Sequence, residues 1–443
     1  MSSPWACRSI LSSATPVPGC PNILIFLDWA NRLRFIDNEF VSAIDGGTIE
    51  TVNPHNEKPI VSVQEATKKD VDRAVAAARR AFNGPWRSVT PTERGCLLAK
   101  LAKLIERDIE VLASIEALDN GKALPMARGD VGFSTNCLRY YAGWADKIFG
   151  QTIDIDPNNL VYTRHEPIGV CAQIIPWNFP LMMWVWKIGP AIATGNTVVI
   201  KSSEQTPLSA LYVARLVREV GFPPGVINVL SGHGPTAGAA LAAHMDVDKV
   251  AFTGSTRVGR EILQAAARSN LKKVTLELGG KSPNIVFPDA DLDNALAWVN
   301  FGIYFNHGQC CCAGSRILVH EAIYEEFLKR FKQRSQENKV GDPFHPSTFQ
   351  GPQVSQIQFD RILGYIEEGK RAGANVVTGG GRLGSEGYYI QPTVFSDVDE
   401  NMKIVQEEIF GPVCTVQKFS DEAEAIRIAN NTNYGKFLSS FVH

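Results

Sequence analysis

The stretch GVCAQIIPWNFPLMMWVWKIGPAIATGNTVVIKSSEQTP, residues 169–207, decides the fold. It holds a short apolar run, VCAQII, then a segment that predicts a helix over 181–193, then a β-branched run, TVVIK. Short β-branched runs that alternate with amphipathic helices are typical of a parallel sheet with crossover helices. The alternation continues with the runs VINVLS and VDKVAFT and with helices expected over 207–220, 235–243 and 256–267.

A second series of strands and helices begins after KVTLELGG, which ends at residue 280. The runs NIVF and RILVH alternate there with helices expected over 291–305 and 323–337. We therefore expect an α/β protein whose domains divide near 279–280. The expected parts are 1–33, an atypical N-terminal segment; 34–148 with 168–279, the first domain; 149–167, a small β arm; and 280–443, the second domain.

The bulk composition excludes several classes of protein. The chain has 443 residues, 44% hydrophobic and 20% charged, with a formal net charge of -2. This balance is typical of a globular protein and gives no electrostatic basis for binding nucleic acid or an anionic membrane. Nine cysteines without C-x-x-C spacing indicate neither a disulfide framework nor a zinc site, so no metal is expected. Free thiols favour a reducing compartment, with the cytoplasm preferred and mitochondria as the alternative.

Two apolar segments need a separate interpretation. The longest, residues 179–200, is interrupted by lysine, proline and glycine, so we interpret it as a buried helix, a turn and a strand rather than a membrane span. The first 31 residues follow no regular period and contain the short run NILIFL. An unstructured start is preferred for them over a targeting peptide.

Two motifs point to a chemical reaction. Glu277 lies in TLELGGKSPN, where a strand meets a glycine turn, and a triple cysteine, 310–312, lies in FNHGQCCCAGSR. A thiolate attacks a carbonyl carbon, and a carboxylate base activates the water that hydrolyses the resulting thioester. The spacing does not select one of the three thiols, and three core cysteines are the alternative interpretation. A metal site that includes His307 is disfavoured, because adjacent thiols point in different directions and no second ligand pair is present.

Glycine-rich turns point to a nucleotide. SGHGPTAG and FTGSTRVG (252–259) each join an expected strand to an expected helix, and helix N-termini at such turns bind phosphate. In the second turn Gly254 suits the tight bend and Ser255 the N-cap. The neighbouring strand leads to Lys201 and Glu204. An acid there accepts hydrogen bonds from both ribose hydroxyls and repels a 2′-phosphate, which favours NAD over NADP.

From about residue 35 to 435 the chain resembles the aldehyde dehydrogenase superfamily, and within it the broad-specificity, hydrolytic, NAD-dependent branch. The segments that carry the resemblance are IIPWNFP, KSSEQTP, FTGSTRVG, LELGGKSPN, FNHGQCCCAGSR and EEIFGPV. The resemblance implies a Rossmann-like parallel sheet that forms an NAD-binding domain, a second α/β catalytic domain and a β arm for oligomerisation. It also implies oxidation of aldehydes to carboxylic acids with NAD as hydride acceptor. The implied route passes through a cysteine thiohemiacetal and a thioester, which a glutamate-activated water hydrolyses.

The resemblance also assigns roles to single positions. It implies that Cys311 is the nucleophile, that Glu277 is the general base, and that Asn178 supplies a side-chain donor to the oxyanion hole. The cofactor-binding residues implied in the same way are Ile175, Trp177, Lys201, Glu204, Gly254, Ser255, Gly259, Glu408 and Phe410. Family members that transfer the acyl group to coenzyme A lack the glutamate, so Glu277 implies a free acid product. The family often has glutamine at the position of His307, to which we assign no role.

The sequence departs from the family pattern at both ends. In the family a longer tail follows NNTNYG and includes a strand that pairs across subunits, whereas here KFLSSFVH follows. We therefore expect an incomplete catalytic domain, and a homo-oligomer, a dimer or tetramer in the family, that is weakened by the missing strand. Two alternatives remain: a non-catalytic homologue that binds dinucleotide or pairs with an intact subunit, and a cysteine hydrolase without redox chemistry. The sequence does not specify the aldehyde.

Overall fold

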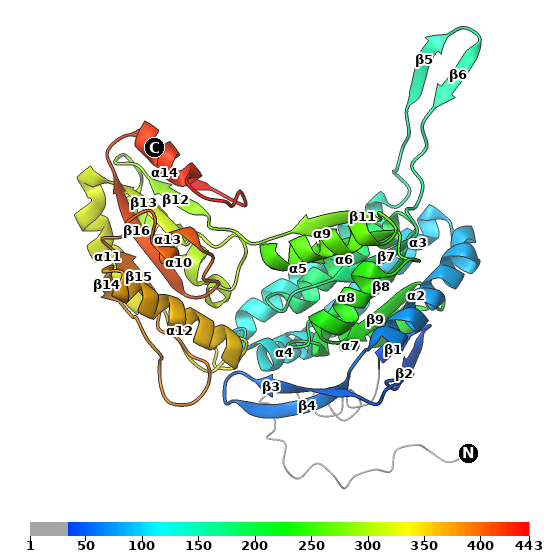
Figure 1. Ribbon diagram of the computed structural model, residues 1–443, viewed down its shortest axis with the longest axis horizontal. Coiled ribbons are helices and arrows are strands. Elements are labelled where there is room, and N and C mark those ends of the chain that lie inside the picture. The colour runs from blue at the N-terminus through cyan, green and yellow to red at the C-terminus, as the bar shows by residue number, and fades with distance from the viewer. Residues whose placement is uncertain (1–33, 443) are drawn as a thin grey trace.

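The computed structural model describes residues 34–442, so the N-terminal segment expected over 1–33 lies outside the described residues. Two sheets organise the described part of the chain, one in each half of the molecule in Figure 1. Within residues 34–442, the first sheet has seven strands in the order β11-β10-β7-β8-β9-β1-β2, and the second has six in the order β14-β15-β16-β13-β12-β17. The expected α/β class is confirmed.

The strands predicted from residue 169 onward form the parallel part of the first sheet. They are β7 (Val170–Ile174), β8 (Thr197–Ser202), β9 (Ile227–Ser231), β10 (Lys249–Thr253) and β11 (Lys273–Glu277). Every residue of β7, β8 and β9 is buried, because helices cover both faces of the sheet, and this explains why the runs are continuously apolar. The sequence did not predict that β1 (Arg34–Ile36) and β2 (Glu39–Val41) extend this sheet antiparallel beyond β9.

The crossover helices between these strands are α6 (Pro180–Ala193), α7 (Leu208–Val220), α8 (Ala239–Ala243) and α9 (Thr256–Arg268). Three of them match the expected ranges to within one residue at each end. The helix expected over 235–243 was wrong at its start, because residues 234–238 form a wider π turn and α8 begins at Ala239. Apolar side chains of α6 and α7 pack on one face of the sheet, and those of α2, α8 and α9 on the other.

The N-terminal helices of the described part are α2 (Lys68–Asn83), α3 (Pro91–Arg107), α4 (Ile109–Asn120) and α5 (Leu124–Trp144). Gly121 ends α4 with φ of +83°, and a Cβ at this position would lie 2.8 Å from the rings of both Pro54 and Pro352. This is a conformation and a space that only glycine fits. The chain can therefore turn directly from α4 into α5 at this point.

The β arm expected over 149–167 is a hairpin of β5 (Thr152–Asp156) and β6 (Asn159–Tyr162). It projects away from the rest of the molecule in Figure 1. Its apolar side chains are exposed: Leu160 is 80% exposed and Ile155 is 62% exposed. A second hairpin, β3 (Thr48–Asn53) with β4 (Lys58–Gln64), lies near α4 on the opposite side.

The second sheet is parallel except at one edge, where β14 pairs antiparallel with β15. Its strands are β12 (Pro283–Val286), β13 (Arg316–His320), β14 (Asn375–Thr378), β15 (Thr393–Ser396), β16 (Val413–Phe419) and β17 (Ser439–Phe441). The helices of this half are α10 (Leu292–Tyr304), α11 (Tyr324–Gln336), α12 (Gln356–Arg371), α13 (Lys403–Gln406) and α14 (Glu422–Asn430). The segment after NNTNYG forms the edge strand β17 beside β12.

The apolar stretch 179–200 divides into α6 and β8, as expected. Over residues 34–442, none of the helices combines the length and the apolar composition that crossing a bilayer requires.

Candidate functional site

A cavity of about 150 Å³ lies where the carboxyl ends of β7 and β10 face the cysteine loop. Seven residues singled out by sequence line it: Trp177, Asn178, Gly254, Ser255, Cys311, Glu408 and Phe410. The structure therefore brings together segments from residue 177 to residue 410. The carboxyl ends of parallel strands are where open α/β sheets bind their ligands.

The loop that precedes the cysteines is bonded directly to the turn that follows β7. The side chain of Asn178 is buried and its Nδ2 donates a hydrogen bond of 3.0 Å to the carbonyl of Gln309. Asn306 returns a bond of 2.9 Å from its Nδ2 to the carbonyl of Asn178. Because the Gln309 carbonyl needs a donor, it fixes which end of the Asn178 amide carries hydrogen. The amide has a second N–H for another acceptor.

The cysteine loop has a backbone conformation that periodicity cannot reveal. Asn306 and His307 both have positive φ, 49° and 61°, although neither is glycine. At Gly308 a Cβ would lie 2.0 Å from the carbonyl oxygen of Gly411, so the loop packs against the segment that carries Phe410. Left-handed residues other than glycine cluster at functional sites, where surrounding contacts hold them in place.

The three adjacent thiols differ in environment. Cys311 lines the cavity, whereas the Sγ atoms of Cys310 and Cys312 lie 3.4 Å apart. Hydrogen bonds with the other two thiols, followed by burial, raise the pKa of Cys310. Hydrogen bonds from Cys310 and Cys311 lower the pKa of Cys312. The hydrogen bond from Cys310 lowers the pKa of Cys311, but contact with Cys312 and burial outweigh it, so that pKa is raised. The thiol that faces the cavity is therefore not the most acidic of the three.

The turn after β10 has the features of a phosphate site. Ser255 is the N-cap of α9, and its side chain accepts a bond of 3.3 Å from the Val258 N–H. A Cβ on Gly254 would lie 2.5 Å from the ring of Phe252, and one on Gly259 would lie 2.8 Å from Leu278. Glycine is thus required at both positions by packing, and it leaves the backbone N–H groups at the N-terminus of α9 accessible.

Lys201, near the end of β8, and Glu204, just after it, lie together as the sequence predicts, but neither is among the described residues that line the cavity. The Lys201 ammonium donates to the carbonyls of Ser202 and Gly232, at 2.8 and 2.6 Å, and lies 3.3 Å from Glu204. Burial lowers the pKa of Lys201, while Glu204 acts in the opposite direction. Ile175 is also buried outside the cavity and donates its N–H to the Lys201 carbonyl at 3.1 Å.

Glu408 and Phe410 enter the cavity from the loop before β16. The Glu408 carboxylate accepts a bond of 2.9 Å from the Gly280 N–H, and burial raises its pKa. The ring of Phe410 meets that of Trp177 edge to face, with centroids 5.3 Å apart. Phe410 has a positive φ of 62°, and its carbonyl is held by Gln358 at 2.8 Å.

Sequence reasoning missed Gln358 and Arg361, two cavity residues on the first turns of α12. Arg361 donates to the Glu408 carbonyl at 3.1 Å, so α12 positions the loop that carries Glu408 and Phe410. Neither residue belongs to a recognisable motif. The available sequence signal was the Ser355 N-cap, which marks the start of the helix but not its neighbours.

Glu277, unlike the predicted catalytic residues Cys311 and Asn178, is not one of the described residues that line the cavity. It ends β11 with its side chain 61% exposed. Its carboxylate forms an ion pair with Lys436 instead. The predicted nucleophile and the predicted base are therefore near in the fold without facing the same cavity.

Comparison with known proteins identifies the family of this chain. The family model described as aldehyde dehydrogenase family matches residues 40–442. This chain belongs to the aldehyde dehydrogenase family. An aldehyde dehydrogenase of Emericella nidulans is 71% identical over 409 residues, which is 92% of this chain and 82% of that protein. The mitochondrial aldehyde dehydrogenase of Sus scrofa is 58% identical over 410 residues, 92% of this chain and 79% of that one.

The solved structures similar to this chain include an NAD+ complex of an aldehyde dehydrogenase from Bacillus cereus. The TM-score is 0.94 at 51% sequence identity, and the match covers 96% of this chain and 86% of the other. The similarity therefore spans both sheets and the cavity between them.

Proposed function

We propose that this protein oxidises aldehydes to carboxylic acids with NAD as the hydride acceptor. The observation that carries the proposal is the shared cavity, in which Cys311 and Asn178 face the N-terminal turn of α9 and the Glu408 loop. A thiol for nucleophilic attack, an amide donor and a phosphate turn thus border one space. A non-catalytic homologue would have no physical reason to keep this combination, so we do not favour that alternative.

The residues around the cavity fit a dinucleotide. Thr253 lines the cavity beside the turn at Gly254 and Ser255, and its buried Oγ1 has no hydrogen-bond partner within residues 34–442. An unsatisfied buried hydroxyl is costly and indicates a missing polar partner. We propose that Gly254, Ser255 and Gly259 hold the phosphates. Glu408 and the remaining predicted residues, Ile175, Trp177, Lys201, Glu204 and Phe410, would hold the riboses and the nicotinamide. Bound NAD would supply the hydride acceptor for the oxidation.

The first half of the reaction belongs to Cys311 and Asn178. The Cys311 thiolate adds to the aldehyde carbon, and the carbonyl electron pair moves to oxygen. The second N–H of the Asn178 side chain and the backbone N–H of Cys311 donate to that oxygen. Preorganised donors of this kind lower the barrier because they require no reorganisation during the reaction. As the electron pair on oxygen re-forms the carbonyl, the same carbon would give up its hydride to the bound cofactor, and the acyl group would remain on the sulfur as a thioester.

The second half belongs to Glu277. Its carboxylate takes a proton from water, the hydroxide adds to the thioester carbon, and the C–S bond breaks to release a carboxylic acid and the Cys311 thiolate. The test of the whole proposal is NADH formation from NAD and an aldehyde by the purified chain, and its loss in Cys311→Ala. Ester cleavage that needs no NAD, as the sole activity, would instead support a cysteine hydrolase.

We further propose a division of labour within the fold. Residues 34–148 with 168–279 would form the NAD-binding domain, residues 280–443 the catalytic domain, and residues 149–167 an arm for a homo-oligomer. The exposed Ile155 and Leu160 on the arm support the last role, because exposed apolar residues on a projecting hairpin favour association. Light scattering on the purified chain tests it.

The compartment is also a proposal. We propose the cytoplasm, supported by free cysteines at seven positions within the described residues, of which Cys96 and Cys312 are exposed. Mitochondria are the second candidate, because the similar protein of Sus scrofa is named as a mitochondrial aldehyde dehydrogenase. Microscopy of the full chain with a C-terminal fluorescent tag separates the two.

A further inference from the structure

We propose that Lys436 is a latch that holds the Glu277 carboxylate outside the Cys311 cavity and thereby slows hydrolysis of the acyl-enzyme. This inference rests on the proposed function. Lys436 lies outside every recognised motif, and it would control the second half of the reaction, in which the thioester is hydrolysed.

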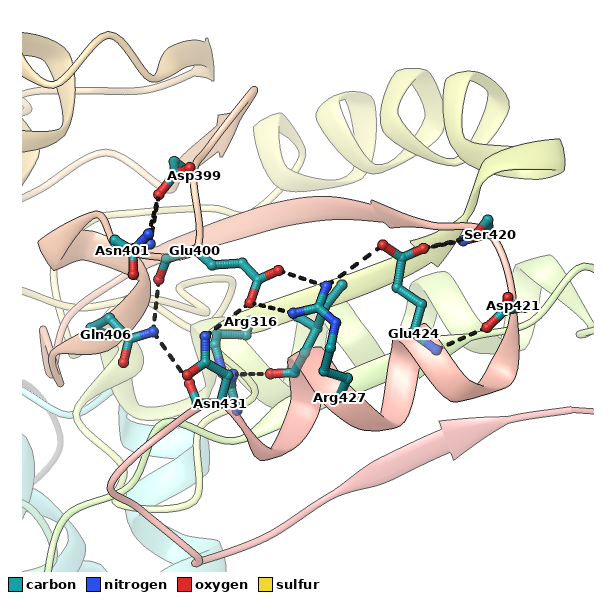
Figure 2. Close-up of polar contacts among 11 residues, drawn as sticks. Arg316, Asp399, Glu400, Asn401, Gln406, Ser420, Asp421, Glu424, Arg427 and Asn431 are labelled. Carbon is teal, nitrogen blue, oxygen red and sulfur yellow. Dashed lines mark hydrogen bonds and ion pairs between the residues drawn. The ribbon is translucent and has the colours of Figure 1, made fainter.

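The position of Lys436 follows from the anchoring of α14. Figure 2 shows the Arg427 guanidinium on the Glu400 carboxylate, with bonds of 3.0 and 2.9 Å. Asn431 donates to the same carboxylate at 2.9 Å. Arg316 is buried in β13 and donates to the carbonyls of residues 428 and 429 at the end of α14, at 2.9 and 2.8 Å. The chain therefore leaves α14 from a fixed point.

The segment beyond α14 is fixed at its other end as well. β17 pairs parallel with β12, with Ser439 opposite Asn284. Lys436 lies between these two anchors, and its side chain is 23% exposed. A lysine held at both ends of a short segment has little freedom to move its stem away. Its position is thus set by the fold rather than by a search of the ammonium over the surface.

The latch passes close to the predicted nucleophile. A Cβ placed on Gly280 would lie 2.2 Å from the carbonyl oxygen of Cys311 and 2.9 Å from the Cβ of Lys436. The space between the Cys311 carbonyl and the Lys436 side chain therefore has no room for a side chain at position 280. From this position the ammonium of Lys436 reaches the Glu277 carboxylate. Lys436 also borders a second cavity of about 560 Å³, which residues of β12, α14 and β17 line as well.

The contact has opposite effects on the two half-reactions. The positive charge of Lys436 favours the thiolate of Cys311 and so helps the first half. A Glu277 oxygen that accepts the lysine hydrogen bond is not free to accept a proton from water in the second half. Lys187 also faces Glu277, but burial lowers its pKa, and no hydrogen bond joins it to that carboxylate among the described contacts. Lys436 is therefore the cation that holds the base.

Rapid mixing with saturating NAD and an aldehyde tests the latch. In the unmodified chain we expect a burst of NADH followed by a slower steady state, because hydrolysis is the slow step. Lys436→Met should raise the steady-state rate about two- to fivefold, as expected for release of a partly exposed ion pair, and should shrink the burst. Lys436→Arg should keep the original burst. Lys68→Met, which removes an exposed lysine paired with Asp72 on α2, is the matched control and should change neither.

A second measurement does not depend on the folding of a variant. Raising the salt concentration screens the exposed pair, so the steady-state rate of the unmodified chain at saturating NAD should rise. An unchanged or lower steady-state rate in Lys436→Met overturns the latch, as does a rate of the unmodified chain that does not respond to salt. If the unmodified chain forms no NADH in either phase, the proposed function itself fails and the latch fails with it. Normal turnover without a change in Lys436→Met refutes the latch alone.

Discussion

Asn306 donates a 2.9 Å hydrogen bond from its side chain to the backbone carbonyl of Asn178. This bond joins the turn after β7 in the first half of the molecule to the loop that carries the cysteines in the second. The return bond from Asn178 to Gln309, at 3.0 Å, closes the link. These two bonds hold the Asn178 amide in a fixed position relative to the cysteine loop. A change at either Asn178 or Asn306 should therefore lower activity.

Replacing Asn178 tests the oxyanion donor. We expect Asn178→Ala to lower kcat by about 10²–10³, the usual cost of losing one preorganised donor. Binding of NAD, measured by the shift of the melting temperature on adding NAD, should be retained. Asn306→Ala is the control, because it loosens the same unit without removing the donor. Equal losses of kcat in the two variants would show that Asn178 acts only through the fold.

Replacing Glu204 tests the preference for NAD. Glu204→Gln removes a negative charge beside Lys201, so NADP should gain relative to NAD by about tenfold in kcat/KM, or ~1.4 kcal/mol. Steady-state rates with each nucleotide give the ratio. Glu261→Gln, on the exposed face of α9, is the matched control and should leave the ratio unchanged. An unaltered ratio in Glu204→Gln would place the ribose elsewhere.

The hairpin of β5 and β6 gives a prediction about assembly. Leu160→Asp places a charge on a side chain that is 80% exposed in the single chain. If the arm is an interface, the change should weaken association by about 2 kcal/mol, the value of burying one leucine. Light scattering over a range of concentrations measures it, with Asp154→Asn on the same hairpin as control. The same mass for all three proteins at every concentration would exclude the arm from the interface.

Burial of His307 should make the folded chain less stable against unfolding in acid. Burial lowers its pKa from 6.5 to about 3, so the unfolded chain binds the proton more readily between these values. The stabilisation is complete above pH 6.5 and is lost as the pH falls towards 3. Between pH 7.5 and 5.5 the free energy of unfolding should fall by about 1.4 kcal/mol from this group.

Urea unfolding of the unmodified chain and of His307→Gln at the two pH values checks this prediction. Glutamine has a similar reach and does not titrate, so its variant should lose less stability between the two pH values. Parallel losses in both proteins would mean that His307 does not contribute to acid sensitivity.

The sequence was sufficient for the elements whose signal is local. The runs that form β7, β8, β9 and β10 are short and rich in β-branched residues. The helices between them have recognisable limits, such as the Ser255 N-cap of α9. The predicted start of α8 was wrong because residues 234–238 form a π turn, and its composition does not differ from that of an α-helical turn. The pairing of β1 with β9 could not be predicted, since it joins residues 35 and 229.

The candidate site divides in the same way. Family motifs named Cys311 and Asn178, and the structure places both on one cavity. They also named Glu277, but a motif does not state where a side chain points, and the contact with Lys436 depends on a segment far along the chain. Gln358 and Arg361 reach the cavity because α12 packs against the loop that carries Glu408 and Phe410. No local sequence pattern predicts that packing.

The central claim is that Cys311 captures the aldehyde carbon and carries the acyl group. Acid quenching of the chain during turnover with NAD and an aldehyde, followed by mass spectrometry of its peptides, tests it directly. We predict an added acyl mass on Cys311 that grows during the burst and is absent in Cys311→Ala. An acyl mass on Cys310 or Cys312, or NADH formation by Cys311→Ala at the original rate, would contradict the account.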